Sequence, residues 1–344
     1  MGRKEILLTI TVTVALIILF GTNMIVLADK DIIFTAAPVQ EESRLNTMES
    51  INYSDNINIP CEEYKSGYEI SLDSCYDKSV IIEFLDGDTC TEISLQDYLI
   101  MVVMSEMPYT FEVEALKAQA IAARTYTLRI LEDSNRHGKN SVCNSPAHCS
   151  AALTKESYIA RYSEKAYNDA YDIVSEAVYD TDGIVITYDG ALCCAVYHSS
   201  SGDYTENSYN LWGTYTPYLV SVPNTENTKP CTLSLSADKF TKALLGFSTN
   251  VSEIKTIKND SGRCEKVIFG EYEISGSTLR SRLSLKSCDF DISFENGEVT
   301  IVSYGYGHGI GMSQTGANAM AESGYNCFDI LTHYYTGIDI EILK

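Results

Sequence analysis

The sequence has 344 residues, of which 45% are hydrophobic and 21% charged, so it is long and apolar enough to fold around a substantial core. Its net charge is -22, from 25 basic and 47 acidic residues. A charge of that sign and size repels the phosphate backbone of nucleic acids, and we therefore expect no nucleic-acid partner.

Residues 1–29 are predicted to form a short cytoplasmic tip and a transmembrane anchor. Between Ile6 and Ala28 the sequence contains no charged residue, and a run of this length is sufficient to cross a bilayer. The alternative is a cleaved signal peptide, but the run exceeds the usual signal core of roughly 7 to 15 residues. Arg3 and Lys4 precede the run, so the positive-inside rule predicts that the following chain is exported.

The exported part begins with a predicted linker over residues 30–79, which is rich in Asn, Ser, Asp, Glu and Lys. A strand is expected at residues 80–84, followed by a turn at Asp86-Gly87 and a second short strand near residues 91–93. This pattern indicates that a hairpin opens the fold.

Two helices are predicted next. Ser94 is a suitable cap for a helix that runs to Glu106, where Pro108 prevents its continuation. A second helix should start after Thr110 and reach about Leu131, with small residues at helical spacing on its core face.

The remaining elements complete an α+β fold with a core and an insertion. A helix around residues 167–177 and a hairpin over residues 185–197 should deliver His198 to a loop. Short alternating segments over residues 224–298 predict a strand-rich insertion subdomain. The core then consists of residues 80–223 and 299–344, which end in a strand, a glycine-rich loop and a helix near residues 314–323.

Glu106 is the first candidate for chemistry. It lies among apolar residues from Val102 to Met107, and such surroundings raise the pKa of a carboxyl group until it holds a proton near neutral pH. The alternative is an ordinary glutamate exposed at the end of a helix. No second carboxylate can be placed opposite Glu106 from the sequence, although glycoside hydrolysis usually needs two.

Two further segments combine polar or small residues. The stretch from His198 to Asn207 is crowded with hydroxyl groups, yet it lacks a nucleophile-elbow pattern and also suits a polar turn. From Gly305 to Gln314 glycines alternate with larger residues, without the strand-helix-strand context of a dinucleotide site. We expect these glycines to let the backbone approach a bulky sugar, with His308 beside it.

A possible metal site follows the second helix. Two nitrogen and two sulfur ligands, the set that a closed tetrahedral zinc site prefers, occur at His137, Cys143, His148 and Cys149. A disulfide between Cys143 and Cys149 is the alternative in an oxidising compartment. A zinc peptidase is not favoured, because no His-Glu-x-x-His pattern occurs. We expect a structural zinc ion without a catalytic role.

Several motifs, in order, resemble the stage II sporulation protein D family over about residues 80–340. They are Tyr98, Glu106-Met107-Pro108, residues 114–126 (EALKAQAIAARTY), His198-Ser199-Ser200-Ser201-Gly202, Thr205-Glu206-Asn207, Trp212, Pro217-Tyr218-Leu219 and residues 307–314 (GHGIGMSQ). A series of motifs in the same order is more specific than any one of them.

The resemblance implies mixed helices and antiparallel strands around a long groove. It also implies a lytic transglycosylase that cleaves peptidoglycan glycan strands to 1,6-anhydro-muramic acid ends, with Glu106 as the catalytic acid and base. The substrate-binding residues carried over from the family motifs are Lys117, Arg124, His198, Ser200, Thr205, Glu206, Tyr218, His308 and Gln314.

The resemblance further implies a single-pass protein of the mother-cell membrane, with its catalytic domain outside the cytoplasm and facing the forespore. Family members act during engulfment beside stage II sporulation proteins P and M. The alternative function is a noncatalytic, peptidoglycan-binding activator of a partner amidase, which would have no need of a carboxyl group in an apolar setting.

Overall fold

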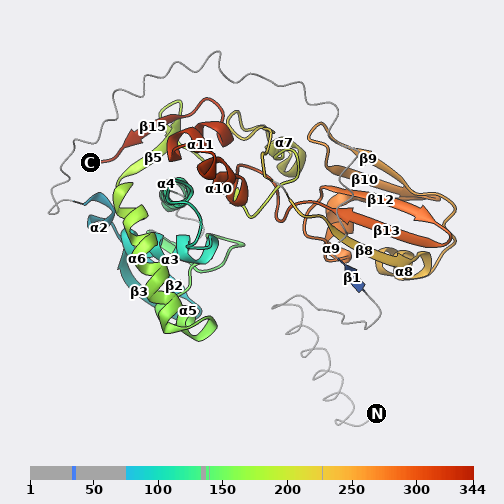
Figure 1. The fold of residues 1–344 in the computed structure, drawn as a ribbon, viewed down its shortest axis with the longest axis horizontal. Coiled ribbons are helices and arrows are strands. Elements are labelled where there is room, and N and C mark those ends of the chain that lie inside the picture. The colour runs from blue at the N-terminus through green and yellow to red at the C-terminus, as the bar shows by residue number, and fades with distance from the viewer. Residues whose placement is uncertain (1–32, 36–74, 133–136, 139, 227) are drawn as a thin grey trace, which may run out of the picture.

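The computed structural model describes residues 33–35, 75–132, 137–138, 140–226 and 228–344 (Figure 1). Helices and short sheets at one end are joined to a strand-rich unit at the other. Separate helical and antiparallel regions of this kind make an α+β fold, which confirms the predicted class.

The predicted hairpin is present and directly follows the short helix α2 (Tyr76–Ser79). Strand β2 (Ile81–Asp86) pairs antiparallel with β3 (Thr89–Ser94), and Gly87 adopts a φ of +60° in the turn, a conformation that glycine reaches without a steric penalty. Strand β4 (Ser141–Cys143) joins the other edge of β2 in a parallel pairing. The resulting three-stranded sheet carries one of the predicted zinc ligands, Cys143.

Helices α3 (Leu95–Glu106) and α4 (Val113–Leu131) match the prediction. The Ser94 hydroxyl accepts the Asp97 N–H at 3.1 Å, as expected of an N-cap. The small residues of α4, including Ala120 and Ala123, are fully buried. They allow the close approach of the helices that surround α4.

Six further elements, which come before or after these helices in the sequence, complete this end of the molecule. They are α2 (Tyr76–Ser79), α5 (Lys155–Arg161), α6 (Glu164–Asp180), β5 (Ile184–Tyr188), β6 (Ala191–Leu192) and β15 (Asp339–Ile342). Strand β5 lies between β15 and β6. Strand β6 ends at Leu192, so it is shorter than the strand that was predicted over residues 192–197.

His198 lies in a strand, so its predicted placement in a loop is wrong. Strand β7 (Tyr197–His198) pairs in parallel with β14 (Met312–Ser313). A pairing between segments so far apart in the sequence leaves no local pattern from which it could be predicted.

The strand-rich unit has its own core. It contains β8 (Cys231–Ser236), α8 (Ala237–Leu245), β9 (Lys255–Lys258), β10 (Cys264–Phe269), β11 (Tyr272–Ser275), α9 (Gly276–Arg282), β12 (Phe290–Glu295) and β13 (Glu298–Ser303). Phe240, Phe269 and Phe290 are buried in a hydrophobic cluster separate from that of the helical end. Strand β13, which the sequence analysis assigned to the C-terminal core, pairs with β8 and β12 of this unit.

Part of the predicted linker is also ordered, because β1 (Ile33–Thr35) pairs with β8. The predicted anchor at residues 1–29 lies outside the described residues. Within the described ranges, no helix is both long and apolar enough to span a bilayer.

Three further short helices are present, and the last two of them pack against α4 at the helical end (Figure 1). They are α7 (Ser208–Trp212), α10 (Gln314–Glu322) and α11 (Cys327–Tyr334). Helix α10 confirms the predicted final helix, although α11 follows it and was not predicted. Because α10 begins at Gln314, directly after β14, the glycine-rich loop leads into the candidate site.

Candidate functional site

Glu106 is the last residue of α3 and is half-buried. Its Oε1 accepts the backbone N–H of Ala151 at 3.0 Å, and its Oε2 accepts Nε2 of Gln314 at 3.3 Å. Another hydrogen bond holds residues 151–153 against the end of α3, because the Leu153 N–H donates to Ser105 Oγ at 2.8 Å. The carboxyl group is therefore held by fixed, uncharged donors from two distant parts of the chain.

Burial raises the pKa of the Glu106 carboxyl group, while the hydrogen bonds from Ala151 and Gln314 act in the opposite direction. Removal from water disfavours the charged form, and here this effect is larger than that of the donors. Among the described residues, no other carboxyl group contributes to the shift. Glu106 is thus suited to hold a proton and to give it up.

Two phenols lie close enough to Glu106 to sense its charge. The pKa of Tyr197 is raised well above its ordinary value, first by burial and then by Glu106. Its hydroxyl group shares a 2.8 Å hydrogen bond with Ser150 Oγ. The pKa of Tyr98 is also raised, mainly by burial, with Glu106 as a minor cause. Tyr98 is one of the family motif residues, whereas Tyr197 was not identified from the sequence, although it directly precedes the motif residue His198.

His198 belongs to a buried chain of hydrogen bonds. Its Nδ1 lies 3.1 Å from the Ile310 carbonyl oxygen, and its Nε2 lies 2.6 Å from Ser201 Oγ. A carbonyl oxygen only accepts, so Nδ1 carries the proton and Nε2 accepts from the hydroxyl group. Ser201 Oγ in turn accepts Nη2 of Arg263 at 3.0 Å.

Burial, followed by the nearby His308 and Arg263, lowers the pKa of His198 well below its ordinary value. The pKa of His308 is lowered to about 4, chiefly by burial. The two rings are in contact, with centroids 5.7 Å apart. Both imidazoles are therefore neutral near pH 7, which makes this pair a fixed hydrogen-bonding unit rather than a source of positive charge.

The glycine-rich loop packs against the protein itself, contrary to the expectation that its glycines make room for a sugar. A Cβ atom at Gly309 would lie 2.5 Å from the Arg263 guanidinium group, and one at Gly311 would collide with the Val196 carbonyl oxygen. Both residues have positive φ values. Glycine is required here because the loop passes close to the strand-rich unit and to β7.

Glu206 is almost completely buried, and its hydrogen bonds go to protein groups. Its Oε1 accepts the Asn207 N–H and Asn210 Nδ2, each at 2.8 Å. Its Oε2 accepts Asn259 Nδ2 at 2.9 Å and lies 4.0 Å from Arg263 Nε. Since Asn259 and Arg263 belong to the strand-rich unit, Glu206 connects that unit to the core.

Three other candidate residues also bind protein groups. Arg124 is fully buried and makes hydrogen bonds of 2.6 to 2.9 Å with Asp77. Lys117 is paired with Asp180 at 2.9 Å. The Tyr218 hydroxyl group accepts the Cys194 N–H at 2.8 Å. The structure places Arg124 in the core, where it connects α4 to α2.

Thr205 and Ser200 complete the set. Thr205 is buried, and its hydroxyl oxygen accepts the Val222 N–H at 2.9 Å. Ser200 lines a cavity of about 420 Å³ that also contains Tyr306 and Thr315. Thr315 directly follows Gln314 in the sequence, and Ser200 is the member of the predicted set that lines this cavity.

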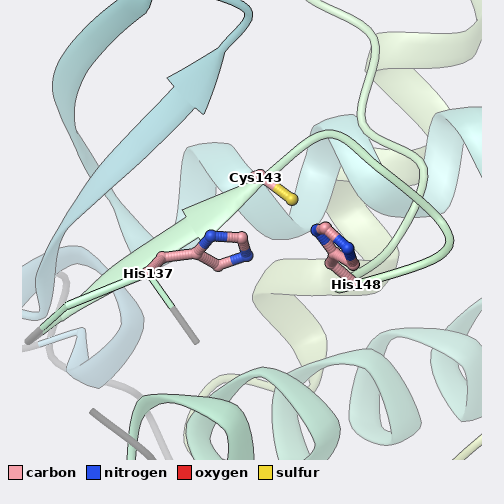
Figure 2. A group of neighbouring side chains, drawn as sticks. All are labelled: His137, Cys143 and His148. Carbon is pink, nitrogen blue, oxygen red and sulfur yellow. The ribbon is translucent and has the colours of Figure 1, made fainter. Parts of the chain in front are cut away.

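Three of the four predicted metal ligands converge. The ligand atoms of His137, Cys143 and His148 all lie within 4.8 Å of one another, and Figure 2 shows the three side chains pointing toward a common centre. Nε2 of His137 is buried and has no hydrogen-bond partner. Bonds of about 2.0 to 2.3 Å from each ligand to one zinc ion would require only a slight contraction of this group.

Cys149 lies at the edge of this group. Its Sγ is 3.5 Å from the Cys143 backbone nitrogen, and the described structure contains no disulfide between the two. The segment from Cys143 to Cys149 leads directly to Ala151, which donates to Glu106. An ion held by this segment would therefore also fix a hydrogen-bond donor of the candidate site.

The comparisons with known proteins identify the family. The profile of the family described as "Stage II sporulation protein" matches residues 86–188. The chain is 35% identical to Stage II sporulation protein D of Bacillus amyloliquefaciens over 76% of this chain and 78% of the relative. The chain belongs to the stage II sporulation protein D family. This confirms the family predicted from the motifs.

Two further proteins are similar to this chain. The identity to Stage II sporulation protein D of Bacillus subtilis is 34%, over 72% of this chain and 74% of the relative. An amidase enhancer of Bacillus subtilis is 27% identical over 69% of this chain and 39% of its own length. The chain is thus also similar in sequence to a protein whose name refers to an amidase.

Proposed function

We propose that this stage II sporulation protein D homologue is a lytic transglycosylase that cleaves the glycan strands of peptidoglycan. The observation that carries the proposal is Glu106, a half-buried carboxyl group with a raised pKa and two fixed neutral donors. A protein that only binds and activates an amidase has no need to keep a carboxyl group under these conditions.

The reaction needs only one carboxyl group because muramic acid supplies the nucleophile. Protonated Glu106 donates its proton to the glycosidic oxygen as the C1–O bond breaks. The C6 hydroxyl group of the same muramic acid attacks C1, and the Glu106 carboxylate accepts the C6 hydroxyl proton. The products are a free 4-hydroxyl end and a 1,6-anhydro-muramic acid end.

The neighbours of Glu106 suit both halves of this cycle. Burial favours the protonated acid, whereas Ala151 N–H and Gln314 Nε2 stabilise the carboxylate that forms when the proton leaves. Opposing effects of this kind bring the pKa toward the working pH, where a single group serves best as acid and then as base.

Mass analysis of peptide-free glycan strands digested by the full chain tests the proposal. We expect fragments that end in 1,6-anhydro-muramic acid, 18 mass units lighter than hydrolysis products because no water is added. Reducing ends would indicate hydrolysis instead. If no fragments form, while a partner amidase is stimulated equally by the wild type and by Glu106→Gln, the activator function would replace this one.

We also propose a structural zinc ion held by His137, Cys143 and His148, with Cys149 as the fourth ligand. The convergence of three ligand atoms and the unpaired Nε2 of His137 support it. A closed site with four protein ligands has no open position for water, so the ion would tie down the loop and take no part in the chemistry.

The setting that we propose for the reaction is the outer face of the mother-cell membrane, toward the forespore, during engulfment. The charge-free run over residues 6–28 supports an anchor, and the family name supports a role in sporulation. Stage II sporulation proteins P and M are the proposed partners. Co-purification of both proteins with the full chain from sporulating cells would test this part.

A further inference from the structure

An aromatic surface lies beside the candidate site and is not used by the chemistry above. It is formed by α7 and the turn that follows it, where Tyr209, Trp212 and Tyr215 are 61%, 45% and 65% exposed. Leu211 between them is 41% exposed. We call these four residues the aromatic platform. Large apolar side chains gathered on one short exposed segment are typical of a binding surface.

The segment that forms the aromatic platform contributes no exposed charge of its own, although Asn207 and Asn210 of this segment donate to the carboxylate of Asp260. From Tyr204 to Tyr218 the only charged residue is Glu206, and that side chain is buried beneath the segment with its oxygens already bonded. The chain as a whole has a net charge of -22. A segment whose exposed side chains are aromatic or apolar and uncharged suits a ligand recognised through ring faces, hydroxyl groups and amides.

The aromatic platform is also rigidly held. The Ser208 N–H donates to the Leu219 carbonyl oxygen at 2.9 Å, and Ser208 Oγ accepts the Thr216 N–H at 2.9 Å. Helix α7 ends at Gly213, which adopts a φ of +70°. Both ends of the segment are therefore fixed, and binding would cost little conformational entropy.

A continuous backbone connection joins the aromatic platform to the catalytic carboxyl group. Glu206, two residues before α7, forms a bridge with Ile310, and its N–H donates to the Gly309 carbonyl oxygen at 2.7 Å. Gln314, four residues after Ile310, donates to Glu106. The part of this connection from Ile310 to Gln314 spans at most about 14 Å, because it is four residues long. A polymeric glycan strand could therefore contact both regions.

We propose that the aromatic platform binds the glycan strand at sugars distant from the bond that Glu106 cleaves. The ring faces of Tyr209, Trp212 and Tyr215 would stack on the C–H faces of the pyranose rings, and their O–H and N–H groups would bond to sugar hydroxyl and acetamido groups. The inference rests on the proposed function for its ligand, but it concerns binding and not cleavage.

Trp212 makes the test direct, because it is the only tryptophan of the chain. In the full chain carrying Glu106→Gln, which binds without cutting, peptide-free glycan strands should shift the tryptophan emission to shorter wavelength in a saturable manner. Adding Tyr209→Ala and Tyr215→Ala should weaken the affinity at least about 10-fold, since loss of a stacked ring costs on the order of 1 kcal/mol.

Tyr162→Ala is the matched control. Tyr162 is 56% exposed, close to the value for Tyr209, and it follows α5, which lies far from α7 (Figure 1). This variant should keep its glycan affinity within about twofold. An equal affinity with and without the two platform tyrosines, or an emission that does not move at saturation, would overturn the proposal and leave the surface to a protein partner.

Kinetics separate this proposal from the proposed function. In the otherwise wild-type chain, loss of Tyr209 and Tyr215 should raise KM with little change in kcat, because distant sugars are bound equally in the ground and transition states. Binding to the aromatic platform without any 1,6-anhydro product would refute the transglycosylase and retain the binding surface. Normal formation of the 1,6-anhydro product with an unchanged KM would refute the binding surface and retain the transglycosylase.

Discussion

Glu106 and Glu206 are both at least half-buried, and both lie in motifs of the family, yet their surroundings differ. Glu106 accepts two hydrogen bonds from uncharged donors and has a raised pKa. Glu206 accepts three and lies 4.0 Å from Arg263. A carboxylate saturated by its own protein is structural, whereas one with unused acceptor positions is able to exchange a proton with a substrate.

The largest effect should come from Glu106→Gln. The amide keeps the shape of the side chain but cannot donate and then accept a proton, so the cleavage rate should fall roughly 100-fold to 10,000-fold. The free energy of unfolding should change little, because a carboxyl group with a raised pKa contributes no stability through its charge. The Gln314 amide can also rotate so that its oxygen accepts from the new amide nitrogen. Product release from purified glycan and urea unfolding would measure the two quantities, and a wild-type rate would refute the assignment.

Glu206→Gln should show the opposite pattern. Its amide nitrogen would face a donor such as Asn259 Nδ2, and the nearby Arg263 would lose its counter-charge. We expect the free energy of unfolding to fall by about 2–4 kcal/mol. The kcat of the folded fraction should fall far less than in Glu106→Gln. If Glu206→Gln instead abolished cleavage without loss of stability, the distinction between the two carboxylates would be wrong.

Local signals in the sequence were sufficient to place Glu106 but not Glu206. The Ser94 cap and Pro108 fixed both ends of α3, and the apolar neighbours of Glu106 indicated its raised pKa. The burial of Arg124 depends on Asp77, 47 residues earlier, and that of His198 on Ile310, 112 residues later. No periodicity within either segment carries this information.

Helix α11 was not predicted, although its N-terminus carries a recognisable sequence pattern. Asn326 and Asp329 form a capping box at the start of α11, a pattern that predicts a helix N-terminus. The group of His137, Cys143 and His148 shows the opposite case. There the density of ligands within a short segment predicted that four side chains converge, and three of them do, whereas Cys149 lies outside the group.

An intermediate effect is expected from Cys143→Ser. The variant should lose zinc from about one ion per chain to a small fraction, and its melting temperature should fall by about 2–4 °C for each kcal/mol of lost stability. Cleavage should slow several-fold, because the Ala151 N–H would no longer be held toward Glu106. Elemental analysis and a thermal melt of protein purified under reducing conditions would measure the first two.

Cys90→Ser is the control for the zinc site, since Cys90 is exposed on β3 and outside the ligand group. It should keep both zinc and melting temperature. Substoichiometric zinc in the wild type, with no change in Cys143→Ser, would contradict the proposed site and leave its four proposed ligands as ordinary packing residues.

The smallest effect should be a shift in pH dependence caused by Gln314→Ala. Gln314 Nε2 donates to Glu106 Oε2 at 3.3 Å and lowers the pKa of that carboxyl group, in opposition to burial. Without this donor the pKa of Glu106 should rise further, so the acid would stay protonated to a higher pH. Activity that depends on the protonated acid is present below the pKa and lost as pH rises through it. The alkaline limb of kcat/KM should therefore move to higher pH, while the maximum rate falls modestly because the carboxylate is less stabilised.

Thr315→Ala is the control, since Thr315 is the next residue on α10 and its hydroxyl group donates to the Ser199 carbonyl oxygen instead. A limb that stays in place in Gln314→Ala, or moves to lower pH, would mean that the limb does not report the ionisation of Glu106.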